Sequence, residues 1–201
     1  MEIRRDLKII SDIIEPRTRV LDLGCGEGDL LLYLKQTKNI YGFGIEIDTE
    51  EVIQCLAKGL NVIHYDINKG LSFIDDNSFD YVVLSKTIQQ LKSPGKLLEE
   101  VLRISKKAII SFPNFGNIKV RTYLLLKGQM PVTSELPYSW FDTPNIHLFT
   151  LKDFINLCKV KNIKIEKLIP ITKIGRRGFI MKILPNILSD EVIMVVSRKD
   201  E

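Results

Sequence analysis

The residues best suited to chemistry are three acids and a glycine-rich loop. The stretch VLDLGCGEG, residues 20–28, contains Asp22 and then glycines at alternate positions; Glu46 and Asp66 end later apolar runs. Glycine lets backbone reach positive φ and approach a ligand closely, and a helix starting there offers free N–H groups. Glu46 is placed to accept hydrogen bonds from both hydroxyls of a ribose, and Asp66 from an adenine amino group. Asp22 could fix the loop or bind an ammonium, so the set predicts a nucleoside site.

The spacing of the glycines bears on which nucleoside is bound. Gly24, Gly26 and Gly28 follow G-x-G-x-G, whereas the dinucleotide fingerprint G-x-G-x-x-G requires a glycine where Asp29 stands. No hydride-transfer site is recognisable either. An NAD-dependent enzyme is therefore disfavoured, although the loop alone does not identify its ligand.

Catalytic groups are harder to find. Acceptor contacts are expected just after the fourth predicted strand, at residues 84–91, where there is no acid and no His. The polar side chains there are Ser85, Lys86, Gln89 and Gln90. We interpret Lys86 as a solvated side chain. A general base must reach the proton that it removes, and His147 is a weak candidate, for which we favour a hydrogen bond to backbone that holds its loop. We assign no catalytic residue.

Alternating apolar runs and amphipathic patterns must position these groups. Five runs rich in β-branched residues predict strands at residues 19–24, 40–47, 61–66, 79–85 and 107–113. Helices are predicted from about Gly28, at 50–58 with Thr49 as N-cap and Gly59 as stop, at 95–104, and after a capping box of Thr150 and Asp153. Two late runs, 163–171 and 191–197, predict an antiparallel pair at the sheet edge.

The strands are apolar almost throughout and helices separate them, which is typical of a mostly parallel sheet covered on both faces. In such sheets ligands bind beyond the carboxyl ends of the strands. We therefore predict a single α/β domain, residues 1–201, that is Rossmann-like, with the acids and the glycine loop gathered at one sheet edge.

Composition excludes several classes of protein. The formal charge of +4 is too mild for a nucleic-acid binder, and no apolar run approaches the length of a membrane span. Cys25, Cys55 and Cys158 are odd in number and form no C-x-x-C pair, which favours reduced thiols over disulfides or zinc. Cys25 is explained by its small size, because no neighbouring base is visible. We expect a cytoplasmic protein without a metal, a nucleic-acid partner or a membrane segment.

The motifs VLDLGCGEG (20–28), GIEID (44–48) and SFDYVVLS (78–85), together with Asp66, resemble the class I S-adenosylmethionine-dependent methyltransferases. The resemblance implies a seven-stranded, mostly parallel sheet with one antiparallel strand. It also implies that the glycine loop faces the methionine moiety, that Glu46 binds ribose, and that Asp66 with the Ile67 N–H reads adenine. The predicted contacts to S-adenosylmethionine or S-adenosylhomocysteine are Asp22, Gly24, Cys25, Gly26, Gly28, Glu46, Ile47, Asp66, Ile67 and Ser85.

A narrower resemblance covers nearly the whole chain. Residues 44–71, 111–133 and 136–154 are similar to the MetW family, which is associated with bacterial methionine biosynthesis. This resemblance implies association with MetX, a homoserine O-acyltransferase. The intact cofactor motif beside an acceptor loop with no evident base leads to the hypothesis that the protein supports or regulates that enzyme and that its nucleoside site acts as a sensor. The alternative is a methyltransferase for an unidentified small molecule. A homodimer is a further possibility.

Residues 111–150 form a predicted insertion, or cover, between the fifth strand and the next helix. Its stretch LPYSWFDTPNIHLFT (136–150) holds Trp140 and either covers the cofactor or presents a surface to a partner. Residues 118–128 predict a helix that either packs on the sheet, or binds a partner or covers the cofactor. The sequence GRRGF, residues 175–179, predicts a solvated basic turn.

Overall fold

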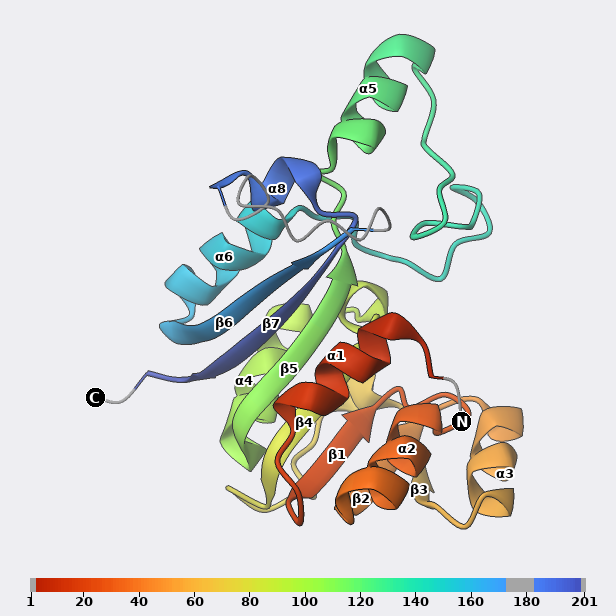
Figure 1. Cartoon of the computed structure of the whole chain (residues 1–201), viewed down its shortest axis with the longest axis vertical. Helices are drawn as coiled ribbons and strands as arrows, with labels where there is room; N and C mark the ends of the chain where they lie inside the picture. Colours follow the sequence, from red (N-terminus) through yellow and green to blue (C-terminus); the bar gives the residue numbers. More distant parts are fainter. Residues whose placement is uncertain (1–2, 173–182, 200–201) are drawn as a thin grey trace.

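The five predicted strands and the two late runs form one sheet in the computed structural model, which describes residues 3–172 and 183–199 (Figure 1). The strand order is β3-β2-β1-β4-β5-β7-β6. The strands are β1 Arg19–Leu23, β2 Tyr41–Glu46, β3 Asn61–His64, β4 Phe79–Ser85, β5 Ser105–Pro113, β6 Ile163–Ile171 and β7 Glu191–Arg198. The α/β class and the seven-stranded, mostly parallel sheet are thus confirmed.

The late antiparallel pair is also confirmed, with one refinement. β7 runs antiparallel to both β5 and β6, so it lies inside the sheet and β6 alone forms that edge. This placement accounts for the composition of β7, in which Val192 to Val196 are all buried, as expected for a strand covered on both faces. The predicted basic turn at 175–179 lies outside the described residues.

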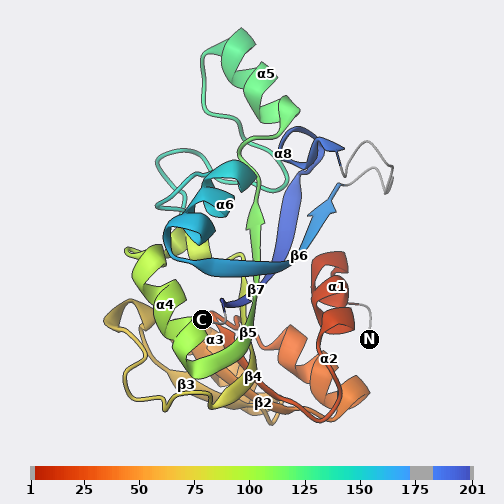
Figure 2. The same ribbon diagram turned by 90° about the vertical axis from the view of Figure 1, so that its left-hand side faces the viewer.

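Helices cover both faces of the sheet (Figure 2). They are α1 Arg5–Ile13, α2 Asp29–Lys38, α3 Thr49–Ala57, α4 Pro94–Ile104, α5 Ile118–Lys127, α6 Leu151–Val160 and α8 Pro185–Leu188, with the short 3-10 turns η1 Ile67–Lys69 and η2 Ile88–Gln90. Side chains alternate along the strands: Val82 and Leu84 pack with α4 and α6, whereas Tyr81 and Val83 pack with α1 and α2. No helix within 3–172 and 183–199 has the length and hydropathy needed to span a bilayer.

Two helix starts illustrate how local sequence fixes the elements. The capping box before α6 forms as predicted, because Thr150 accepts from the Asp153 N–H and Asp153 accepts from the Thr150 N–H. The predicted N-cap of α3 is wrong by one residue: Asp48, not Thr49, accepts from the Glu50 and Glu51 N–H groups. A carboxylate is a strong cap, and Asp48 also leaves the strand in the extended conformation that a cap needs.

Residues 114–149 leave the sheet between β5 and α6, and we call this segment the arm. It contains α5 and a long loop, and both views show α5 standing away from the sheet (Figures 1 and 2). β5 extends through Pro113, so the segment begins at Asn114 rather than at residue 111. The prediction that the helix at residues 118–128 packs on the sheet is wrong, because only Val120 of α5 is buried.

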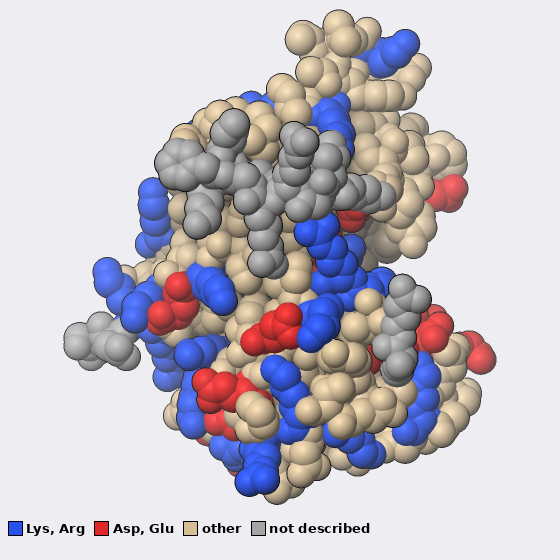
Figure 3. Space-filling view, viewed as in Figure 1, with Lys and Arg blue, Asp and Glu red and all other residues tan. Residues whose placement is uncertain are grey.

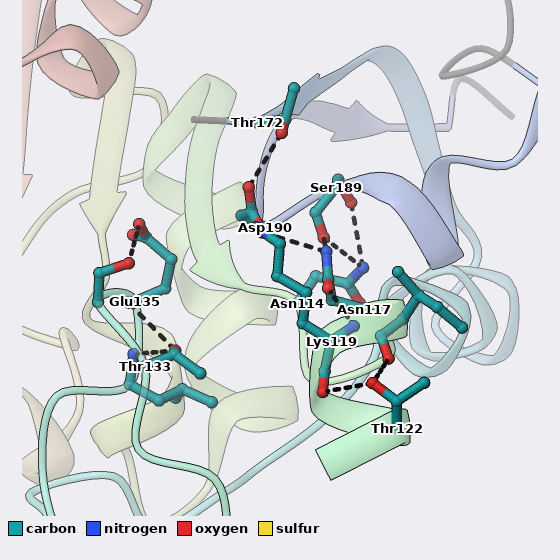
Figure 4. Close-up of polar contacts among 12 residues, drawn as sticks. Asn114, Asn117, Lys119, Thr122, Thr133, Glu135, Thr172, Ser189 and Asp190 are labelled. Carbon is teal, nitrogen blue, oxygen red and sulfur yellow. Dashed lines mark hydrogen bonds and ion pairs between the residues drawn. The ribbon is translucent and has the colours of Figure 1, made fainter. Parts of the chain in front are cut away.

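Polar contacts fix the base of the arm to α8 and to the turn between α8 and β7 (Figure 4). The Asn114 side-chain amide donates to the Asn186 and Ser189 carbonyls, while its oxygen accepts from the Gly116 and Leu151 N–H groups. Asn117 donates to the Ser189 carbonyl and to Asp190, and Lys119 also pairs with Asp190. Buried amides that are fully bonded hold a single geometry, so the arm leaves the sheet in a fixed direction.

Candidate functional site

A cleft of about 740 Å³ opens at the carboxyl ends of β1, β2 and β4, beside the turn that follows β3. That volume is in the usual range for small-molecule sites. All but one of the predicted cofactor contacts line it: Asp22, Gly24, Cys25, Gly26, Glu46, Ile47, Asp66, Ile67 and Ser85. Residues from four separate elements thus meet in one hollow, as expected where parallel strands end together.

Gly28 is the exception, since it is not among the residues that line the cleft. It is the N-cap of α2 with φ 78°, and a Cβ there would collide with Leu60 and approach Cys55 Sγ to 2.8 Å. Gly28 therefore shapes the turn rather than facing a ligand. Gly24, with φ 71°, does line the cleft, and a Cβ on it would come within 2.9 Å of Thr87.

Glu46 organises the floor of the cleft. Its Oε2 accepts from the Gly26 N–H at 2.9 Å, and its Oε1 accepts from the Ile47 and Asp48 N–H groups at 2.7 and 3.1 Å. Each carboxylate oxygen can accept more than one hydrogen bond. The side chain is therefore held rigidly by the glycine loop and still has acceptor capacity for a hydroxyl-bearing ligand.

Asp22 is the most unusual group in the cleft. It is 2% exposed, and its Oδ1 has no hydrogen-bond partner among the described residues. Burial, reinforced by the neighbouring Glu46 charge and opposed by Arg4, raises the pKa of Asp22 to about 8. An unpaired buried carboxyl oxygen is costly, and clustered perturbed groups mark binding sites. The geometry suits a donor or a cation that enters from the cleft.

The lining of the cleft is strongly acidic. Its carboxylates are Asp22, Glu27, Asp29, Glu46, Glu51 and Asp66, against the cationic Arg4 and Lys86. Desolvation, then the Glu46 and Asp48 charges, raises the pKa of Glu51 as well. Such a lining favours a cationic ligand and opposes an anionic one.

Asp66 stands where the third strand leads into η1. Its Oδ1 caps that turn by accepting from the Asn68 N–H at 2.9 Å, and that backbone hydrogen bond is the largest cause that lowers the pKa of Asp66. Ile67 follows directly and also lines the cleft, so an acceptor and a backbone N–H lie side by side at this wall.

Lys86 is not the solvated side chain that we predicted. It lines the cleft at the end of β4 with φ 59°, and its Nζ lies 3.1 Å from Glu191 and 3.6 Å from both Asp6 and Glu135. Burial lowers the pKa of Lys86, but those three carboxylates outweigh it and raise the pKa overall. Lys86 thus joins the N-terminal helix, the arm and β7 at the cleft wall.

His147 lies outside the lining of the cleft, so the weak base candidate has no route to a ligand there. The loop is nevertheless held at this point: the Ile146 and His147 N–H groups both donate to the Gln89 carbonyl at 2.9 Å. The predicted anchoring role is therefore carried by the backbone of His147 rather than by its ring. Burial raises the pKa of the Cys25 thiol, which disfavours the thiolate that a nucleophile needs.

Several cleft residues were not among the predicted contacts, including Arg4, Leu7, Tyr138 and Pro144. Arg4 and Leu7 belong to the N-terminal segment, whose helical period (Leu7, Ile10 and Ile14, all buried) was the available signal. Tyr138 and Pro144 arrive from the arm, and only the tertiary fold shows that they reach the cleft.

The chain is similar to known proteins over most of its length. The model of the family described as methionine biosynthesis protein MetW matches residues 4–196. The chain is 35% identical over 171 residues to the bifunctional methionine biosynthesis protein MetXA/MetW of Rhodopirellula baltica, covering 81% of this chain and 27% of that protein. It is also 26% identical over 146 residues to a demethylmenaquinone methyltransferase of Shouchella clausii, covering 63% of this chain and 62% of that one.

Solved structures agree on the fold. An S-adenosylmethionine-dependent methyltransferase from Mesorhizobium loti matches with a TM-score of 0.68 at 15% identity, covering 95% of this chain and 96% of that one. One from Archaeoglobus fulgidus matches with a TM-score of 0.67 at 19% identity, covering 96% and 91%. At such identities the likeness establishes the class I methyltransferase fold and leaves the chemistry to the site itself.

Proposed function

We propose a function from the premise that the chain belongs to the MetW family. It binds S-adenosylmethionine or S-adenosylhomocysteine in the acidic cleft, and it associates with the homoserine O-acyltransferase MetX, whose activity it supports or regulates. The protein would thereby act in methionine biosynthesis.

The observation that carries the cofactor assignment is the buried, unpartnered Oδ1 of Asp22 in an acid-rich cleft. S-adenosylmethionine carries an ammonium and a sulfonium, which such a cleft attracts. An anionic pyrophosphate, as in NAD, would meet Glu46, Glu51 and Asp66 instead and be repelled. Glu46 would hold the ribose, and Asp66 with the Ile67 N–H the adenine. When bound, S-adenosylmethionine supplies an activated methyl group.

The partner assignment is supported by the relative from Rhodopirellula baltica, whose name joins MetXA and MetW in one polypeptide. Two activities that are fused in one protein are often carried by interacting chains in another. The absence of acid and of His from residues 84–91 also favours a role other than acid–base catalysis.

Methyl transfer to a small molecule is the second candidate. It is favoured by Gln90 and Tyr138, polar side chains that line the cleft and are not among the predicted cofactor contacts. Displacement at a sulfonium depends largely on holding donor and acceptor together, so the lack of a base does not preclude it. Formation of S-adenosylhomocysteine with a small-molecule extract, lost in Glu46→Ala, would favour this candidate.

Calorimetric titration tests the cofactor. S-adenosylmethionine should bind and NAD should not. Glu46→Ala should weaken binding, whereas Glu50→Ala, an exposed acid outside the cleft, should leave it unchanged. Equal binding by both variants, or binding of NAD alone, would contradict the assignment.

Co-purification tests the partner. The acyltransferase of the same organism should form a complex with this protein, and its rate should change when the protein is added. No complex and an unchanged rate, despite cofactor binding, would leave the methyltransferase candidate standing and remove the partner.

A further inference from the structure

The outer part of the arm exposes apolar side chains that nothing in the described chain covers. Leu125 and Leu126, in the last turns of α5, are 82% and 78% exposed. In the following loop Trp140 is 74% exposed and packs edge-to-face against Phe141, with ring centroids 5.7 Å apart. Single exposed leucines are ordinary, but a projecting segment rich in exposed apolar and aromatic side chains marks an interaction surface.

The arm is held at both ends, so these side chains are presented in a fixed position. Its base is bonded through Asn114 and Asn117 to Ser189, in the turn between α8 and β7 (Figure 4). Its loop is bonded to the cleft wall through the Gln89 carbonyl and through Glu135, which pairs with Lys86. A surface that is already ordered loses less entropy when a partner binds. The apolar side chains are therefore held in solvent, where a partner can bind them, and do not pack against the rest of the domain.

Charge on the arm limits what can cover it. Between Ala108 and Ser134 the chain has no Asp and no Glu, while Arg121 and Lys127 lie on α5. Figure 3 shows the projecting part as mainly uncharged, with scattered basic groups and an acidic group; the loop carries the exposed Asp142 beside Phe141. A second copy of the chain would bring the same cations together without an acid of α5 to pair them, which is unfavourable at a two-fold interface. A partner with an apolar centre and acidic margins fits instead.

We propose that Leu125 and Leu126 of α5, with the Trp140–Phe141 pair of the loop, form the docking surface for a protein partner that presents an apolar patch edged by acidic side chains. This inference rests on the proposed function, in which that partner is the homoserine O-acyltransferase. It adds the location: the arm carries the contact, and the acidic cleft does not.

The test measures the affinity of the acyltransferase for the full chain immobilised on a sensor surface. Leu125→Asp combined with Leu126→Asp should weaken binding by at least about 10-fold. The complex would lose the burial of two leucines, and the two new carboxylates would lose hydration or meet the acidic margin of the partner. Trp140→Ala should weaken it separately. The matched control is Val160→Asp on α6, where the original side chain is also 82% exposed, and it should bind as the wild type does. S-adenosylmethionine affinity should be unchanged in all three.

The outcomes separate the two proposals. Wild-type protein that binds no acyltransferase overturns the partner in the proposed function and this inference with it. Wild-type binding that both arm variants retain overturns only the location. If sedimentation shows a wild-type dimer that the double variant dissolves, with acyltransferase affinity intact, the surface belongs to a second copy. If the double variant loses only binding to anionic phosphatidylserine vesicles, it belongs to a lipid surface. Either result overturns the inference.

Discussion

The cleft and the arm differ in the chemistry that they expose. The cleft gathers six carboxylates and a buried oxygen without a partner, whereas α5 presents leucines and no acid at all. The polar groups of the cleft are fixed before any ligand arrives, and those at the base of the arm are bonded to one another. The cleft therefore offers an unpaired acceptor to a small cation, whereas the arm offers exposed apolar side chains to an apolar surface. Their substitutions should therefore have separable effects.

The largest expected effect is on the cleft side. Glu46→Ala removes the proposed acceptor for both ribose hydroxyls, and hydrogen bonds to a charged group contribute about 1.5–3 kcal/mol each. S-adenosylmethionine affinity should fall by about 100-fold or more, measured by calorimetry. Because Glu46 also caps three backbone N–H groups, thermal unfolding is recorded alongside, and Glu46→Gln serves as the milder variant. Retained affinity in a folded Glu46→Ala protein would place the ribose elsewhere.

On the arm side, Asn114→Ala should cost about 2–4 kcal/mol of unfolding free energy, because five buried hydrogen bonds are lost, including those that satisfy the Gly116 and Leu151 N–H groups. Urea denaturation measures the loss. Asn145→Ala is the control, since its side-chain amide makes no hydrogen bond in the part of the chain described. A loss no greater than that of the control would mean that the network does not anchor the arm.

Asp22 predicts how the cleft responds to pH. Its pKa is raised to about 8 in the folded protein, above the ordinary value of 3.8, so its contribution to stability is complete at low pH and is lost as pH rises through about 8. Asp22→Asn should flatten that decline. At pH 9 it should raise the free energy of unfolding by about 1–3 kcal/mol, which is measured as a higher melting temperature. A variant that melts with the same pH profile as the wild type would exclude Asp22 as the cause.

Binding gives an independent measure of the same group. At pH 7 Asp22 is largely protonated, and a bound cation should ionise it, so wild-type titrations in buffers of different ionisation enthalpy should reveal proton release. The Asp22→Asn protein should release less. Equal release by both proteins would show that the ligand does not approach this carboxyl.

Glu191 should produce the smallest effect, and it lies between the two regions. Burial raises its pKa to about 7 despite the opposing Lys86 charge, and the neighbouring Asp6 and Glu135 add to the rise. Its stabilising contribution should therefore decline as pH rises from about 4.5 to about 7. Glu191→Gln should remove that slope from pH-dependent urea unfolding. An unchanged slope would assign it to other groups.

The sequence predicted the sheet well because the signals were local. Apolar β-branched runs predicted all seven strands. The alternating glycines, with Glu46 and Asp66, predicted where the cleft lies. What it missed depended on tertiary contacts. Lys86 looked solvated because Asp6, Glu135 and Glu191, its three partners, are far from it in sequence. The exposure of α5 was equally hidden, since an amphipathic pattern does not reveal whether a neighbour exists to cover it.

Tyr138 belongs to both regions. It lines the acidic cleft, and it also lines a small apolar hollow at the root of the arm with Met130 and Trp140. A partner that displaced Tyr138 on docking would change the affinity of the cleft for its ligand. Thermodynamic reciprocity would then require the ligand to change the affinity for that partner by the same factor.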